Sequence, residues 1–120
     1  MEGKGRITGH TGLLALIGSP VGHSGSPAMY NYSFEKLGLD YAYVAFDIKV
    51  EEVKAALDAM RLFHMRGCNV TMPCKTEATK YMDELSPAAR IIGAVNTIVN
   101  EDGKLIGHMT DGEGFVGNLR

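Results

Sequence analysis

The sequence predicts an α/β domain of three layers (α/β/α), in which helices cover both faces of an open, mainly parallel sheet. Short apolar stretches rich in β-branched and aromatic residues alternate with amphipathic helical stretches, a pattern typical of parallel sheets covered by helices. Late in the chain, a turn at residues 101–103 separates two apolar stretches and indicates a hairpin. This hairpin is expected to add one antiparallel strand to the sheet.

The bulk composition is that of a single ordinary domain. The chain has 120 residues, 45% hydrophobic and 22% charged, which is enough to bury a core without metal or disulfide crosslinks. The net charge of −2 and the lack of a bilayer-length apolar run give no reason to expect a nucleic-acid or membrane partner. The polar N-terminus lacks the apolar core of a signal peptide, so the expected location is the cytoplasm.

Metal chemistry is not expected from the cysteines and histidines. Cys68 and Cys74 are separated by five residues, a spacing that zinc sites do not use, and no second pair accompanies them. The four histidines show no ligand spacing either. We therefore interpret both cysteines as reduced thiols.

The first half of the chain predicts two strands, each followed by a helix. Residues 13–18 read as a buried strand closed by a Gly-Ser-Pro turn. Ser26 is expected to cap the first helix, with Pro27 at its first position and Gly38 after its end. Residues 41–48 are aromatic and β-branched and form the second expected strand. Residues 50–60 carry their apolar side chains on one helical face.

The second half begins with the strand around which the prediction is organised. Residues 68–72 alternate apolar and polar side chains, and Pro73 ends the strand because proline cannot donate to a ladder. A helix is expected over residues 75–82. Ser86 and Pro87 repeat the cap signal and open a short helix through Arg90.

Two further strands complete the expected sheet. They cover residues 94–100 and 104–109, on either side of the predicted turn. A last segment, residues 112–120, follows the hairpin.

Three clusters of polar side chains fall at the ends of predicted strands, the edge at which open α/β sheets bind ligands. They are Ser24 with Ser26, Asn69 with Thr71 and Lys75, and Asn96 with Asp111. Each cluster alone is more often structural, because serines cap helices and loop lysines are solvated. Three clusters of complementary chemistry together favour a site for a small, hydroxylated, anionic molecule.

The clusters differ in the ligand group that each suits. Hydroxyls beside a helix N-terminus suit a carboxylate. The amide of Asn96 both donates and accepts, which suits a diol. An aspartate close to Lys75 would hold the ammonium and alter its proton affinity.

The glycines of residues 112–117 match the dinucleotide-binding fingerprint. That fingerprint needs a preceding strand, a following helix and an acidic residue about twenty positions later. Only three residues follow the motif in this chain. We interpret the match as a flexible helix start and expect no cofactor-binding residues here.

Five motifs together resemble the substrate-binding domain of the shikimate/quinate dehydrogenase family. They are residues 22–27 (GHSGSP), 69–75 (NVTMPCK), 83–87 (DELSP), 92–97 (IGAVNT) and 110–112 (TDG). They stand in the family's order and extend over nearly the whole chain.

The resemblance implies a role for each cluster. Ser24 and Ser26 would bind the substrate carboxylate, and Tyr43 would add a contact to it. Thr71 and Asn96 would bind ring hydroxyls. Lys75 would transfer the proton, with Asp111 beside it. The implied partner is a small molecule, shikimate or quinate, and a homodimer is left open.

The resemblance also implies a reaction and a domain organisation. Residues 1–120 would be the substrate-binding domain of an enzyme that reversibly oxidises shikimate or quinate to the 3-dehydro ketone with NADP or NAD, as part of aromatic amino-acid biosynthesis. The family's NAD(P)-binding Rossmann domain follows this region and is expected to be absent from this chain, so the isolated chain would be inactive.

Two other functions are left open by the residues themselves. The chain could be a stand-alone module that binds a cyclic hydroxy acid without chemistry. Alternatively, it could be a structural domain whose polar clusters only cap helices. Titration with shikimate and quinate separates the structural reading from the other two.

Overall fold

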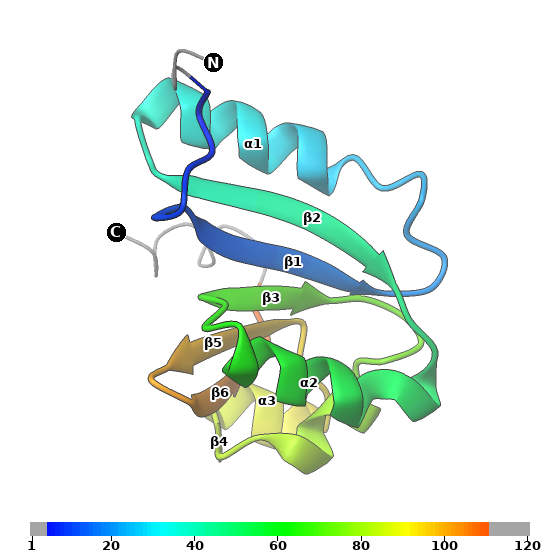
Figure 1. Cartoon of the computed structure of the whole chain (residues 1–120). Coiled ribbons are helices and arrows are strands. Elements are labelled where there is room, and N and C mark those ends of the chain that lie inside the picture. The colour runs from blue at the N-terminus through cyan, green and yellow to red at the C-terminus, as the bar shows by residue number, and fades with distance from the viewer. Residues whose placement is uncertain (1–4, 111–120) are drawn as a thin grey trace.

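A computed structural model describes residues 5–110, which form a six-stranded sheet in the order β2-β1-β3-β5-β6-β4 with helices packed against it (Figure 1). The elements run in the order β1 (Gly12–Gly18), α1 (Ser26–Leu37), β2 (Tyr41–Asp47), the 3-10 helix η1 (Val50–Glu52), α2 (Val53–Leu62), β3 (Gly67–Val70), the 3-10 helix η2 (Glu77–Tyr81), β4 (Glu84–Leu85), α3 (Pro87–Ile92), β5 (Thr97–Glu101) and β6 (Lys104–His108).

The strand directions confirm the predicted sheet. β1 lies in parallel between β2 and β3, and β4 pairs in parallel with β6. β5 runs antiparallel between β3 and β6, so it is the strand of opposite direction. The hairpin of β5 and β6 therefore joins an otherwise parallel sheet.

Helices cover both faces of the sheet, as the predicted three-layer architecture requires. Because successive side chains of a strand point to opposite faces, Leu14 of β1 packs with Phe34 of α1, while Ala15 packs with Leu57 of α2 on the other face. Figure 1 shows α1 on one side of the sheet and α2 with α3 on the other. Among the described residues, no helix is long and apolar enough to span a membrane.

Three predicted elements differ in the structure. β3 ends at Val70 rather than at residue 72, because the Thr71 carbonyl turns to accept from the Cys74 N–H at 3.0 Å, and Met72 is exposed. The helix expected over residues 75–82 is only a five-residue 3-10 helix. The expected strand over residues 94–100 begins at Thr97 instead. β4 was not predicted at all, since two residues carry no periodic pattern.

The expected helix cap at Ser26 is wrong, whereas the one at Ser86 is confirmed. Gly25 occupies the N-cap position of α1, and the Ser24 Oγ accepts from the Ser26 N–H at 3.1 Å. At α3 the Ser86 Oγ accepts from the Ala89 N–H at 3.2 Å, as predicted. Ser24 therefore holds the entry to α1, and the Ser26 hydroxyl is not used for capping.

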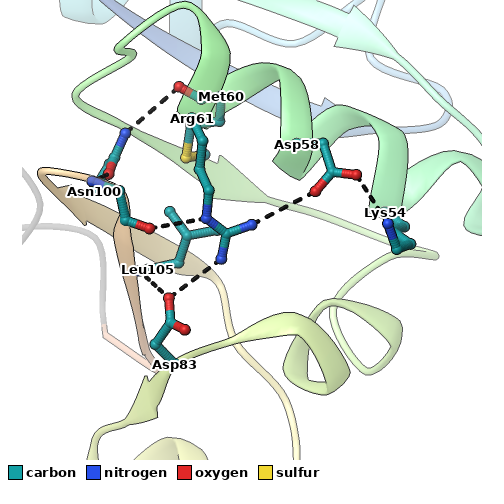
Figure 2. Close-up of polar contacts among 8 residues, drawn as sticks. Lys54, Asp58, Met60, Arg61, Asp83, Asn100 and Leu105 are labelled. Carbon is teal, nitrogen blue, oxygen red and sulfur yellow. Dashed lines mark hydrogen bonds and ion pairs between the residues drawn. The ribbon is translucent and has the colours of Figure 1, made fainter.

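Arg61 connects α2 to the β5–β6 hairpin (Figure 2). Its Nε donates to the Gly103 carbonyl at 2.8 Å, and its guanidinium pairs with Asp83 at 3.2 Å and with Asp58 at 3.6 Å. Asp83 also accepts from the Leu105 N–H at 2.7 Å. That backbone bond, followed by the hydrogen bond from Arg61, lowers the pKa of Asp83 below its ordinary value of 3.8.

We expect the Asp83→Asn variant to unfold at a lower temperature than wild type at pH 7. A depressed folded-state pKa contributes stability above pH 3.8, which is lost as the pH falls through the lower folded value. The folding stability of the variant should therefore depend less on pH, because the contribution of the Asp83 carboxylate to that dependence is removed. Calorimetric melting at pH 7 and pH 3 measures the difference.

The Asp58→Asn variant is the matched control. Among the described residues, the Asp58 carboxylate pairs only with the side chains of Lys54 and Arg61. It is half exposed, so its loss should have a smaller effect on melting. Equal effects of the two substitutions would contradict the role assigned to the Leu105 bond.

Candidate functional site

One edge of the sheet collects the ends of the strands that carry the predicted clusters. Ile17 pairs with Val70 at the carboxyl ends of β1 and β3. Asn69 pairs with Thr97, which places the amino end of β5 there. Thr97 also pairs with His108, so β6 ends at the same edge. The loops that follow β1, β3 and β6 therefore leave the sheet side by side.

Backbone hydrogen bonds beyond the strands join the second and third clusters. The Val70 N–H donates to the Asn96 carbonyl at 2.9 Å, and the Val95 N–H donates to the Lys75 carbonyl at 3.0 Å. The Asn96 N–H donates to the His108 carbonyl at 3.0 Å. These three bonds form a backbone seam that holds the chain at Lys75 against the chain at Asn96.

Thr71 is fixed against the end of β1. Its N–H donates to the Ile17 carbonyl at 2.9 Å, and the Ser19 N–H donates to the Met72 carbonyl at 3.0 Å. A Cβ added to Gly18 would lie 2.3 Å from the Thr71 Cγ2, closer than real carbon atoms approach. Only glycine at position 18 lets the Thr71 side chain take this place.

The two serines of the first cluster have different hydrogen-bond roles. The Ser24 hydroxyl accepts from the Ser26 N–H, which leaves its own hydrogen for a ligand. The Ser26 side chain interacts with the Tyr43 hydroxyl and lowers the pKa of Tyr43. Ser26 thereby connects the start of α1 with the sheet face beneath it.

Tyr43 of β2 is hydrogen-bonded to a residue in the middle of the sheet. Its hydroxyl donates to the Asn69 Oδ1 at 2.9 Å, and its ring stacks on Tyr30 with centroids 4.6 Å apart. Burial, reinforced by Tyr30 and Cys68, raises the pKa of Tyr43, and the interaction with Ser26 opposes that rise. Tyr43 is therefore a neutral donor whose hydrogen is already shared with Asn69.

The Asn96 amide binds the backbone of Thr110, the second residue after β6. Its Oδ1 accepts from the Thr110 N–H at 2.9 Å, and its Nδ2 donates to the Thr110 carbonyl at 2.6 Å. The Thr97 hydroxyl donates to the same Oδ1 at 3.1 Å. One hydrogen on Nδ2 is left to meet a ligand.

Lys75 reaches this edge with a half-buried side chain. Among residues 5–110, no side chain or backbone group forms a hydrogen bond or ion pair with its ammonium. Asp111, its expected neighbour, and the glycine motif at residues 112–117 lie outside the described residues. The adjacent Cys74 is a buried free thiol whose pKa is raised by burial and then by Glu77.

Cys68 is likewise a free thiol, and burial raises its pKa. The interpretation of both cysteines as reduced thiols is therefore confirmed. With their pKa values raised, neither is a reactive nucleophile at neutral pH.

Sequence reasoning missed one member of the polar network. Thr97 is completely buried, yet its hydroxyl contacts Asn69, Asn96 and Thr110. In the sequence it reads as an ordinary β-branched strand residue. The signal that could have identified it is its place directly after Asn96, on the face opposite the apolar Ile98.

We expect the Gly18→Ala variant to lower the free energy of unfolding by about 1–3 kcal/mol, because an added methyl must displace the Thr71 side chain. The Thr71 methyl resonance should shift in the carbon–proton NMR spectrum. Gly9→Ala is the control, since nothing lies within 4 Å of a Cβ at Gly9. An unmoved Thr71 methyl signal in Gly18→Ala would show that the two residues are not in contact.

Comparison with known proteins identifies the family of the chain. Residues 16–98 match the family model described as the shikimate dehydrogenase substrate binding domain. A shikimate dehydrogenase (NADP(+)) of Listeria monocytogenes is 54% identical over 115 residues, which cover 96% of this chain and 40% of the relative. The chain thus spans 40% of the length of this curated relative.

Solved structures give the same result. A shikimate 5-dehydrogenase from Listeria monocytogenes, in complex with shikimate and NAD, superposes with a TM-score of 0.87 at 54% identity, covering 96% of this chain and 40% of that one. A shikimate 5-dehydrogenase from Thermus thermophilus, in complex with shikimate, has a TM-score of 0.81 at 41% identity, covering 91% and 42%. The chain belongs to the family of shikimate dehydrogenase substrate-binding domains.

Proposed function

We propose that this chain is the substrate-binding domain of an NADP-dependent shikimate dehydrogenase, which reversibly oxidises shikimate to its 3-dehydro ketone. The observation that carries the proposal is the backbone seam, which brings Lys75 to Asn96 at the edge where Thr71 and the serines also lie. The named relatives supply the reaction, since they are NADP(+)-dependent shikimate dehydrogenases. Quinate, a related cyclic hydroxy acid, is the alternative substrate.

Carboxylate binding is assigned to the loop that enters α1. Ser24 offers a free hydroxyl hydrogen, and Ser26 stands at the start of a twelve-residue helix whose first turn has no acidic residue. The positive end of the helix dipole and these hydroxyls together favour an anion. Ring-hydroxyl binding is assigned to Thr71 and to the remaining amide hydrogen of Asn96.

Proton transfer is assigned to Lys75. Oxidation of a secondary alcohol needs a hydride acceptor and a group that removes the hydroxyl proton. NADP supplies the hydride acceptor, held mainly by the part of such a protein that this chain does not cover. In the reduction direction the Lys75 ammonium donates the proton that the carbonyl oxygen takes up, and Asp111 is proposed to hold that ammonium in place.

Four expectations from the sequence stay predictions. The Tyr43 contact with the carboxylate is one, because the hydrogen of that hydroxyl is donated to Asn69. The others are a cytoplasmic location, a homodimer, and the lack of dehydrogenase activity in the 120-residue chain. Sedimentation equilibrium tests the homodimer, and an NADP assay of the pure chain tests the activity.

We expect the 120-residue chain to bind shikimate in calorimetric titration, with Ser24→Ala reducing the affinity about 10- to 100-fold. A hydrogen bond to a charged group contributes about 1.5–3 kcal/mol, which corresponds to that range. Ser86→Ala is the matched control, because Ser86 caps α3 and does not contact the site edge. Wild-type affinity in Ser24→Ala would remove Ser24 from the site, and a wild-type chain that binds neither shikimate nor quinate would refute the function.

The Lys75→Met variant tests the chemical role. In a chimera where this chain replaces the matching segment of the Listeria monocytogenes enzyme, kcat should fall about 10²- to 10⁴-fold with little change in KM. Ser24→Ala should instead raise KM, because a carboxylate contact is made equally before and during hydride transfer. If Lys75→Met kept its kcat and raised KM, Lys75 would be a binding residue only.

A further inference from the structure

Buried and half-buried polar side chains on the α1 face of the sheet form a series of hydrogen bonds in which each group donates to the next. The Tyr43 hydroxyl donates to the Asn69 Oδ1 at 2.9 Å. That contact orients the Asn69 amide, so its Nδ2 faces the Thr97 Oγ1 at 3.3 Å and donates to it. A hydroxyl oxygen that accepts from Asn69 has its single hydrogen left to donate elsewhere.

The hydrogen of Thr97 is directed at Asn96. The Thr97 Oγ1 lies 3.1 Å from the Asn96 Oδ1, which can only accept. This fixes which end of the Asn96 amide is oxygen and which is nitrogen. With that orientation, Oδ1 and Nδ2 match the N–H and the carbonyl of Thr110 at 2.9 and 2.6 Å.

Thr97 cannot act on a ligand directly. It is completely buried, and its hydroxyl is already bonded to Asn69, Asn96 and the hydroxyl of Thr110 at 3.2 Å. Its effect must therefore pass through Asn96, whose second Nδ2 hydrogen is available to a ligand, and through Thr110, which directly precedes Asp111 in the chain.

We propose that Thr97 is a positioning residue, whose buried hydroxyl sets the Asn96 amide so that it clamps the Thr110 backbone and presents one N–H to the substrate. The effect of Thr97 on catalysis rests on the proposed function. The clamp, meaning the two hydrogen bonds between the Asn96 amide and the Thr110 backbone, does not. Valine at this position keeps the shape but removes a donor and an acceptor at once. The Asn69 Nδ2 and the Asn96 Oδ1 then each lose a partner, and among the described residues only Thr110 still orients the Asn96 amide.

Amide hydrogen exchange in the 120-residue chain tests the clamp without any ligand. In Thr97→Val the Thr110 amide should exchange about tenfold faster than in wild type, because the bond to the Asn96 Oδ1 is weakened. Thr97→Ser, which keeps the hydroxyl, should restore slow exchange. Thr79→Val is the control, because the Thr79 hydroxyl donates locally, to the carbonyl of Thr76 directly before η2.

The same variants in the chimeric enzyme test the consequence for catalysis. We expect kcat/KM for shikimate to fall about 10- to 100-fold in Thr97→Val, since a displacement of about 1 Å in a reacting geometry has effects of this order. Thr97→Ser should stay within about threefold of wild type, as a hydroxyl-dependent role requires. The Tyr43→Phe variant frees the Asn69 amide to turn and should accelerate exchange of the Thr110 amide to a smaller extent. If Thr97→Val does not fold, the exchange rate in Tyr43→Phe tests the positioning role instead.

Slow Thr110 exchange in a folded Thr97→Val, or in Tyr43→Phe if the valine variant is unfolded, would overturn the proposal. So would an equal loss of kcat/KM in Thr97→Ser and Thr97→Val, because a hydroxyl could not then be the cause. A wild-type chimera that fails to turn over shikimate would refute the proposed function instead, and the exchange rates would still decide the role of Thr97.

Discussion

The site depends on the backbone seam between the chain after β3 and the chain before β5. β3 is only four residues long. At its end the Val70 N–H donates to the Asn96 carbonyl, and farther along the Val95 N–H donates to the Lys75 carbonyl. These bonds tie together segments that are far apart in sequence. Without them, Lys75 would sit in an ordinary loop and Asn96 at the start of an unrelated strand.

Gly18 and Thr71 extend this constraint to β1. The close approach of Thr71 to the end of β1 brings the loop that carries the serines to the same edge. Parallel strands on both sides of β1 are what make this possible, because their carboxyl ends coincide. The antiparallel β5 adds its amino end, so Asn96 enters from the opposite chain direction.

The polar groups below this edge stabilise the arrangement because they satisfy one another. A buried polar group without a partner costs about 1–3 kcal/mol, whereas a fully bonded network costs little and restricts side-chain orientation. Among the residues that the structure describes, no buried side-chain nitrogen or oxygen is left without a hydrogen bond. The mutual hydrogen bonds of Tyr43, Asn69 and Thr97 thus restrict the orientation of the groups that face the ligand.

Much of this architecture could be predicted, because it rests on local patterns. The alternation in β1 and β2, the apolar face of α2 and the cap at Ser86 are each determined by a few neighbouring residues. The convergence of the clusters was a hypothesis, since the register between Asn69 and Thr97 is a long-range property.

The errors also have local physical causes. Ser24 and Ser26 look like equivalent capping residues in sequence, yet neither caps α1, because Gly25, with φ at −82° and ψ at −5°, occupies the N-cap position. Thr97 was missed because the sequence does not distinguish a threonine whose hydroxyl joins a buried polar network from a threonine that only favours a strand. Of the two residues proposed for proton transfer, the structure describes Lys75 but not Asp111.

A shikimate titration followed by the NMR signals of the asparagine side-chain amides tests the central claim most directly. Asn96 lies at the proposed site, while Asn100 lies at the other end of β5, where its Nδ2 donates to the Met65 carbonyl at 2.8 Å. The account predicts that the Asn96 amide and the Thr71 methyl shift along one binding curve while the Asn100 amide stays unchanged. Shifts that appear instead around Phe46 and Phe63, in the apolar groove beside α2, would contradict it.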